Sequence, residues 1–347
     1  MDKIDRWDKF SGHVMRGDLE VAEVFCDQIV SMTKSAPLYL QYRKDFSGWL
    51  NSRGADINRS NMRIILRRLG FPLRDIEKAV RFVRAASVTD SFWMRETGSA
   101  LKYADIAFKS DIYMKAALRG DPDVFSLPEE ATPEITNIGS FDKGWQLREG
   151  KWYLHKAGSP PEIFSELFTS RLAEALGIDT VAYSIDGGHI VCENFVGDGE
   201  CFEHAAAFVD SSEDYEENAL KFGGFSLLRE YMDLIFLDAL VRNSDRHEFN
   251  YGVITHENGA ISMAPNFDNN LSLFCRGVPT VLTRKDPLVS DFIAVKNKMD
   301  FPYAPPKLSV DMLEAVYRQV KREYPFEIDF AVLSEFCMNA YRQITAR

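Results

Sequence analysis

Residues 241–274 read VRNSDRHEFNYGVITHENGAISMAPNFDNNLSLF, and this stretch is the most informative part of the chain. Its pattern predicts a polar loop followed by a β-hairpin whose turn is Asn258-Gly259. Asn-Gly is a strong signal for a two-residue type I′ turn, because both central residues of that turn take a positive φ. With that turn, Asn250 faces Phe267, and Asp268 lies beside Asn250.

Several potential oxygen ligands for a metal ion are expected at the end of this hairpin. Residues that face each other across an antiparallel pair have Cβ atoms about 4.5–5.5 Å apart. The amide of Asn250 and the carboxylate of Asp268 are therefore expected to converge, with Asp245 close by on the preceding loop. Mg²⁺ prefers oxygen ligands and is usually held by one or two protein groups together with phosphates. The hairpin end thus predicts a magnesium–nucleotide site.

The spacing of the three residues supports the same interpretation. In protein kinases an Asp of the catalytic loop accepts the proton of the substrate hydroxyl, an Asn five residues later binds one metal ion, and a later Asp binds the other. Asn250 follows Asp245 by five residues, and Asp268 follows Asn250 by eighteen. Taken singly, each residue is more simply a loop cap or a turn former. The three together favour a catalytic site.

The segments N-S-D-R-H-E-F-N and A-P-N-F-D-N resemble the signature of HipA-like serine/threonine kinases, N-x-D-R-H-x-x-N with a later P-x-[FY]-D. The resemblance covers roughly residues 132–274. It implies ATP and Mg²⁺ as cofactors, Asp245 as the base, and Asn250 and Asp268 as metal ligands. It also assigns Arg246 and His247 to bracing the loop, with His247 at the nucleotide site.

Upstream, residues 138–143 read IGSFDK and are similar to the short phosphate-binding loop of the same family. A glycine in such a loop lets backbone N–H groups approach phosphate oxygens. Taken alone, one glycine before a hairpin is more simply a turn. The resemblance places four residues at the nucleotide: Ile138, Gly139, Ser140 and Lys143.

A hairpin around Glu149-Gly150 ends in Lys156, which shares a strand face with Trp152 and Leu154. Lys156 resembles the family's phosphate-binding lysine, and a solvated lysine is the alternative. Glu166, ten residues later, matches the family's glutamate that pairs with this lysine, although periodicity also permits a solvated position. The family's hinge, where backbone groups meet adenine, falls on Glu193, Asn194 and Phe195.

The remaining chain suggests three domains. Apolar residues spaced three to four apart predict helices between residues 18 and 120, at Leu19, Val21, Val24, Phe25 and Ile29, then at Ile64, Ile65 and Leu69, and at Ile76, Val80 and Val83. Residues 118–134 have the composition of a linker. A helix from Pro160 to Gly177, a strand around Val191 and a helix over 225–243 follow. The expected division is a helical accessory domain (1–120), a kinase N-lobe (121–200) and a mostly helical C-lobe (201–347). The expected fold class is α+β, two-lobed and protein-kinase-like.

Composition narrows the class of protein. The 347 residues include 41 Lys+Arg and 52 Asp+Glu, a net charge of −11, and 46% are hydrophobic. This is a globular composition. No apolar window reaches the roughly 18 residues of a membrane span. The N-terminus lacks the apolar stretch of a secretory signal, and five cysteines without a C-x-x-C pattern argue against a disulfide framework. We expect a cytoplasmic protein that does not act on membranes.

Residues 53–84 are an exception to the acidic balance, with nine basic and three acidic side chains. This stretch predicts contact with an acidic partner, with RNA or DNA, or with the chain's own acidic part, and a solvated helix face is the alternative. The first 130 residues do not resemble the domain through which the family prototype contacts its antitoxin. Toxin–antitoxin biology is therefore not implied.

The predicted activity is transfer of the γ-phosphoryl group of ATP to a Ser or Thr hydroxyl of a protein. The alternatives are a lipid or small-molecule kinase of the same fold and a non-catalytic, nucleotide-dependent binding module. HipA-like kinases can also phosphorylate themselves just before the glycine of the phosphate loop. In this chain the matching residue is Thr136, with Ser140 as the nearest alternative.

Overall fold

The computed structural model describes residues 9–73, 75–277, 286–299 and 301–346. The chain divides into two compact units. The first unit comprises residues 1–157, 191–208 and 253–261. The second unit comprises residues 158–190, 209–252 and 262–347. The predicted catalytic loop and metal ligands belong to the second unit, whereas the predicted phosphate loop and hinge belong to the first.

The first unit opens with an antiparallel sheet. Strands β1 (Gly12–Arg16), β2 (Leu19–Phe25), β3 (Gln28–Met32) and β4 (Phe92–Glu96) lie in the order β3-β2-β1-β4. The prediction that residues 18–33 are helical is therefore wrong. About half of their apolar residues are β-branched, namely Val21, Val24, Ile29 and Val30, and such residues favour strands. Cys26 and Asp27 take φ of 48° and 64°, which turns the chain sharply between β2 and β3.

Short helices complete this part of the first unit: α1 (Leu38–Arg43), α2 (Phe46–Ser52), α3 (Ser60–Arg68), α4 (Ile76–Phe82), α5 (Tyr103–Ile106), α6 (Met114–Arg119) and the 3₁₀ turns η2 (Pro122–Ser126) and η3 (Pro133–Thr136). Helices α3 and α4 confirm the predicted ones. Val14, Tyr113 and Ile135 belong to one apolar core. The predicted division at residue 120 therefore does not coincide with a boundary between the two units, and the expected linker packs inside the first unit.

The predicted hairpin around Glu149-Gly150 is confirmed. It consists of β5 (Lys143–Arg148) and β6 (Lys151–Lys156), and its register places Lys143 directly opposite Lys156. Glu149 and Gly150 have φ of 50° and 82°, as a two-residue type I′ turn requires. Strand β8 (His189–Glu193) confirms the predicted strand around Val191. With β7 (Ser184–Asp186) it gives the sheet order β5-β6-β8-β7.

A second hairpin carries the catalytic segment. Strands β9 (Cys201–His204), β10 (Gly252–Thr255) and β11 (Ile261–Met263) lie in the order β11-β10-β9. The His256 N–H donates to the carbonyl of Ala260 at 2.9 Å, and the Ala264 N–H donates to that of Gly252 at 3.0 Å. These bonds shift the expected register by one residue, so the predicted pairing of Asn250 with Phe267 is wrong.

The turn explains this shift. Gly259 has a φ of 82°, but Asn258 does not take a positive φ, so the loop is not a type I′ turn. Instead the Gly259 N–H donates to the His256 carbonyl at 3.0 Å, and the Asn258 side chain accepts from the Ala260 N–H at 2.9 Å. These bonds close a three-residue loop, the next most common hairpin connection.

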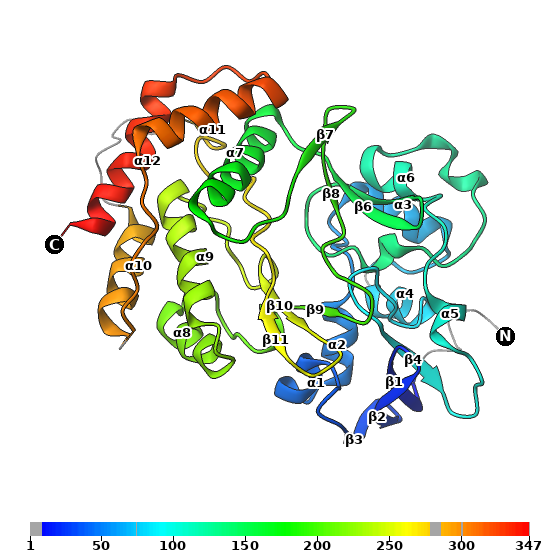
Figure 1. The fold of residues 1–347 in the computed structure, drawn as a ribbon. Coiled ribbons are helices and arrows are strands. Elements are labelled where there is room, and N and C mark those ends of the chain that lie inside the picture. Colours follow the sequence, from blue (N-terminus) through cyan, green and yellow to red (C-terminus); the bar gives the residue numbers. More distant parts are fainter. Residues whose placement is uncertain (1–8, 74, 278–285, 300, 347) are drawn as a thin grey trace. The chain divides into compact units, whose positions relative to one another are not determined.

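The second unit is mostly helical (Figure 1). Helix α7 (Pro160–Leu176) begins and ends as predicted, with Gly177 at φ 73° as its C-cap. Helix α9 (Leu228–Val241) is also confirmed, but ends two residues before Asn243. It packs against three helices, α8 (Tyr215–Gly224), α10 (Pro287–Lys298) and α12 (Phe330–Thr345), while α11 (Val310–Glu323) packs against α7 and α12. The mixture of helices and sheets confirms the α+β class.

In the part of the chain that the structure describes, no helix combines the length and the apolar composition of a membrane span.

Candidate active site

The loop after α9 fixes the predicted base and one predicted metal ligand against each other. Arg242 ends the helix in the left-handed region, with φ 52°. The Asp245 N–H then donates to the Asn243 side chain at 3.2 Å. The Asn250 side chain donates through Nδ2 to the Asp245 carbonyl at 2.8 Å. Because this bond uses the nitrogen of the buried Asn250 amide, the amide oxygen points the other way and is the atom suited to a cation.

Arg246 joins the two ends of the site. Its buried guanidinium forms an ion pair with Asp238 of α9, with N–O distances of 2.9 and 3.0 Å. It also donates to the carbonyls of Asn250, at 2.5 Å, and of Phe267, at 2.6 Å. A fifth bond, of 2.7 Å, reaches the side chain of Asn269. The residues on both sides of Asp268 are thus fastened to the loop that carries Asp245.

Asp268 itself has a φ of 63°, which is uncommon for a residue with a side chain. The Asn269 N–H donates to Glu166 of α7 at 3.1 Å, and a Thr169–Ser272 bond of 3.1 Å ties α7 to the following turn. Glu166 is only 1% exposed. The alternative of a solvated Glu166 is therefore wrong, and this carboxylate positions the backbone next to Asp268.

Electrostatics indicate that Asp245 and Asp268 face the same region. Burial raises the pKa of the Asp245 carboxyl, and the negative charge of Asp268 raises it further. His247 and Arg276 act in the opposite direction. His247 also accepts from the Phe249 N–H through Nδ1 at 3.2 Å, so its ring braces the loop.

The donor set fits Mg²⁺ bound together with a nucleotide. Among the described residues, no three His, Cys, Asp or Glu side chains form a metal cage. Asn250 and Asp268 supply one amide and one carboxylate. Mg²⁺ typically takes one or two protein oxygens and completes its shell with phosphates and water.

The predicted phosphate loop lies in the first unit and leads into β5. Gly139 has a φ of 120°, and a Cβ atom there would lie 2.3 Å from the Lys143 ammonium. A side chain at this position would be strained and would displace the end of the Lys143 side chain from the loop. Lys143 and Lys156 are both 7% exposed and oppose each other in the hairpin. Lys156 is thus not the solvated lysine of the alternative interpretation, and two cationic side chains share one buried face beside Gly139.

Glu134 holds both ends of this phosphate loop in place. It accepts from the Trp145 N–H at 2.8 Å and from the Asn137 side chain at 2.9 Å. Burial raises the pKa of Glu134 to about 7, although Arg59 and Lys143 act against that rise. The two ends of the loop are thereby held to one carboxyl group.

The two predicted phosphorylation sites differ in access. Thr136 is buried, and its hydroxyl donates to the Ala86 carbonyl at 2.9 Å. Ser140 is exposed. Ile138 is half-buried between them. Of the two hydroxyls, that of Ser140 is therefore the more accessible.

The predicted hinge follows β8 in the first unit. The Asn194 N–H donates to the Trp152 carbonyl at 2.8 Å, which extends the sheet and turns that amide away from any ligand. Glu193 pairs with Lys151 at 2.6 Å, and Phe195 packs edge-on against Phe202. The role of these residues in binding adenine stays a prediction.

The described structure thus brings together Asp245, Asn250, Asp268 and Glu166 within the second unit. Lys156 lies in the first unit, and its predicted ion pair with Glu166 stays a prediction. Sequence reasoning missed the residues that hold the site: Asp238, Asn243, Asn269 and Glu134. Asp238 did carry a signal, because it is the one charged residue in the apolar run 234–241, and a buried acid needs a partner.

The basic stretch 53–84 is largely neutralised within the first unit. Five of its bases form ion pairs there: Arg53, Arg68, Lys78, Arg81 and Arg84. Arg59 is buried beside the Phe141 carbonyl, and Arg74 lies outside the described residues. The prediction of an acidic partner or nucleic acid therefore depends on the exposed Arg63 and Arg67.

Comparison with known proteins gave structural likenesses only. No family model and no curated protein matches the chain. A proinflammatory kinase of Helicobacter pylori, CtkA, is 17% identical over 58% of this chain and 89% of its own, with a TM-score of 0.38. HipA of Shewanella oneidensis MR-1, from a toxin–antitoxin complex with HipB and operator DNA, is 11% identical over 96% of this chain and 95% of its own, with a TM-score of 0.49. The chain is similar in structure to these two proteins, each at less than 20% sequence identity.

Proposed function

We propose that this protein is an ATP- and Mg²⁺-dependent kinase that transfers the γ-phosphoryl group to a Ser or Thr hydroxyl of a protein. The observation that carries this proposal is the arrangement of Asp245, Asn250 and Asp268 around the Arg246 guanidinium. A base, an amide oxygen and a carboxylate in this order are the parts that phosphoryl transfer needs.

Each residue has a distinct role in this proposal. Asp245 accepts the proton of the attacking hydroxyl, and burial keeps its pKa closer to the operating pH than that of an exposed aspartate. Asn250 and Asp268 would hold Mg²⁺, which supplies charge neutralisation at the phosphates. Within the first unit, Lys143 and Lys156 oppose each other in the β5–β6 hairpin and are the two cationic side chains proposed to bind phosphate.

Self-phosphorylation is part of the proposal. Ser140 is the better acceptor because Thr136 is buried and its hydroxyl is already bonded. A phosphate adds about −1.5 to −2 charges. At Ser140 it would repel ATP from the phosphate loop, so self-phosphorylation should inhibit the enzyme.

The test is incubation of the purified protein with γ-labelled ATP, Mg²⁺ and a whole-cell extract. We expect labelled protein bands whose label survives acid and neutral hydroxylamine, as phosphoserine and phosphothreonine do, whereas hydroxylamine cleaves acyl phosphates. Asp245→Asn is the matched negative control, since it is nearly isosteric. Label in a lipid or small-molecule fraction alone would favour a different substrate, and ATP binding without any transfer would favour a binding module.

A further inference from the structure

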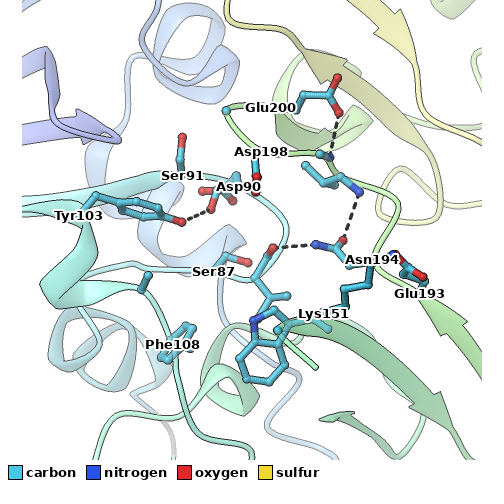
Figure 2. A pocket seen from close by; sticks show the side chains of 17 residues that line it. Ser87, Asp90, Ser91, Tyr103, Phe108, Lys151, Glu193, Asn194, Asp198 and Glu200 are labelled. Atoms are coloured by element: carbon cyan, nitrogen blue, oxygen red, sulfur yellow. Dashed lines mark hydrogen bonds and ion pairs between the residues drawn. The ribbon is translucent and has the colours of Figure 1, made fainter. Parts of the chain in front are cut away.

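A cavity of about 530 Å³ lies wholly within the first unit (Figure 2). Its wall combines residues 87–91, α5 with the segment after it, the turn of the β5–β6 hairpin and residues 193–200. It shares only Glu193 and Asn194 with the predicted nucleotide site. Cavities of this size accommodate small molecules or single side chains of a partner.

The wall is held in place by its own hydrogen bonds. Asn194 donates through Nδ2 to the Val88 carbonyl at 3.0 Å and through its backbone N–H to the Trp152 carbonyl at 2.8 Å. Glu200 accepts from the Gly197 N–H at 2.9 Å and contacts His256 at 2.8 Å. Three parts of the wall are thereby joined, so the cavity is formed before any ligand arrives, which lowers the entropic cost of binding.

The charge of the wall is negative, with four carboxylates and one lysine. Three of the carboxylates have partners: Asp90 pairs with Arg53, Glu193 with Lys151 and Glu200 with His256. Asp198 forms no hydrogen bond or ion pair with any residue that the structure describes. Burial raises the pKa of Tyr103 on the same wall, and the charges of Asp90 and Asp198 raise it further (Figure 2).

The wall also offers flat apolar surfaces. Phe108 and Trp152 line the cavity together with Tyr103. Aromatic faces attract cations and pack against aliphatic stems. A phosphate-bearing ligand would find no suitable cation here, because Lys151 already pairs with Glu193 at 2.6 Å.

We propose that this cavity binds a guanidinium or ammonium group carried on a short apolar stem. The cation pairs with Asp198, and the stem packs against Phe108 and Trp152. The group belongs either to a free small molecule or to an Arg or Lys side chain of a protein. The proposal is independent of the proposed kinase activity.

Calorimetric titration of the full chain tests it, with butylguanidinium and butylammonium as free probes and butylurea as the uncharged control. A second arm uses a blocked Ala-Arg-Ala peptide and its citrulline analogue. We expect saturable binding of the charged probes and about fivefold weaker binding to Asp198→Asn, as for a partly exposed ion pair. Glu23→Gln, which changes an exposed carboxylate on β2, is the matched control and should bind like the parent protein.

The two arms of the titration distinguish a free small molecule from a protein side chain as the source of the cation. Binding of the free probes without the peptide supports a small molecule, and tighter binding of the arginine peptide supports a protein side chain. Equal binding of butylurea, unchanged affinity in Asp198→Asn or no saturable binding in either arm would overturn the proposal. Asp198 is exposed, so its variant should fold, and an unchanged thermal transition checks this.

Discussion

Replacing Arg246 with lysine should destabilise the second unit by about 3 kcal/mol or more. The guanidinium forms two bonds with Asp238, and three more bonds reach acceptors on Asn250, Phe267 and Asn269. Lysine carries its donors on one nitrogen and lacks the planar fork, so it can keep the contact with Asp238 but cannot span the rest. Each buried acceptor left without a donor costs about 1–3 kcal/mol. The loss of all three donors is therefore expected to cost at least about 3 kcal/mol.

Urea unfolding can assign this loss to the correct unit. The four described tryptophans, Trp49, Trp93, Trp145 and Trp152, belong to the first unit, so their fluorescence reports on that unit. Circular dichroism at 222 nm follows the long helices of the second unit as well. With a slope of about 3 kcal/mol per molar urea, the midpoint of the dichroism transition should fall by about 1 M.

Arg318→Lys is the matched control, because Arg318 lies on the surface of α11 and pairs only with the neighbouring Glu314 among the described residues. Its effect should stay within about 0.5 kcal/mol. A loss below about 1 kcal/mol in Arg246→Lys would refute the assignment of Arg246 as the residue that joins the catalytic loop to the metal-binding segment.

Four further predictions concern the proposed chemistry. Asp245→Asn should lower phosphoryl transfer by about 10²–10⁴ with ATP affinity nearly unchanged, as measured by labelled transfer and nucleotide titration; wild-type turnover would contradict its role as base. Asp268→Asn should weaken ATP binding only when Mg²⁺ is present, and equal affinity of the parent protein with and without Mg²⁺ would argue against the metal site. Because the base acts in its ionised form and burial raises the pKa of Asp245, transfer should decline on acidification at a higher pH than for an exposed aspartate, which a pH–rate profile measures. Mass spectrometry after incubation with ATP should find phosphate on Ser140 before Thr136, and Ser140→Ala should retain activity longer; modification outside residues 134–143 would disprove this.

The sequence predicted the local elements best where a turn or a cap had a specific chemical cause. Pro160 and Gly177 bound α7 because proline suits the first helical turn and glycine the left-handed C-cap. Glu149-Gly150 closes its hairpin for the same kind of reason. Residues 18–33 were misassigned because spacing of apolar residues in a short window does not distinguish a helix from a twisted strand pair.

Buried polar partners could not be predicted from one sequence. Glu134 and Glu203 both lie buried, and burial raises the pKa of each to about 7. Each accepts from a distant backbone N–H group, of Trp145 in one case and of Leu38 in the other. Backbone donors are the same at every position, so the amino-acid sequence carries no mark of which one a distant carboxylate will meet.

The candidate site also shows why its predicted residues lie on one connected segment although the predicted hairpin geometry was partly wrong. The sequence placed Asp268 beside Asn250 by hairpin register, and that register is shifted by one residue. A shift of one residue in a strand turns every side chain to the other face, and would scatter a site that depended on register alone. Here Arg246 holds the carbonyls of Asn250 and Phe267 directly, so the backbone around Asp268 is positioned independently of the hairpin turn. The turn at Asn258 should therefore tolerate substitution, whereas Arg246 and its partner Asp238 should not.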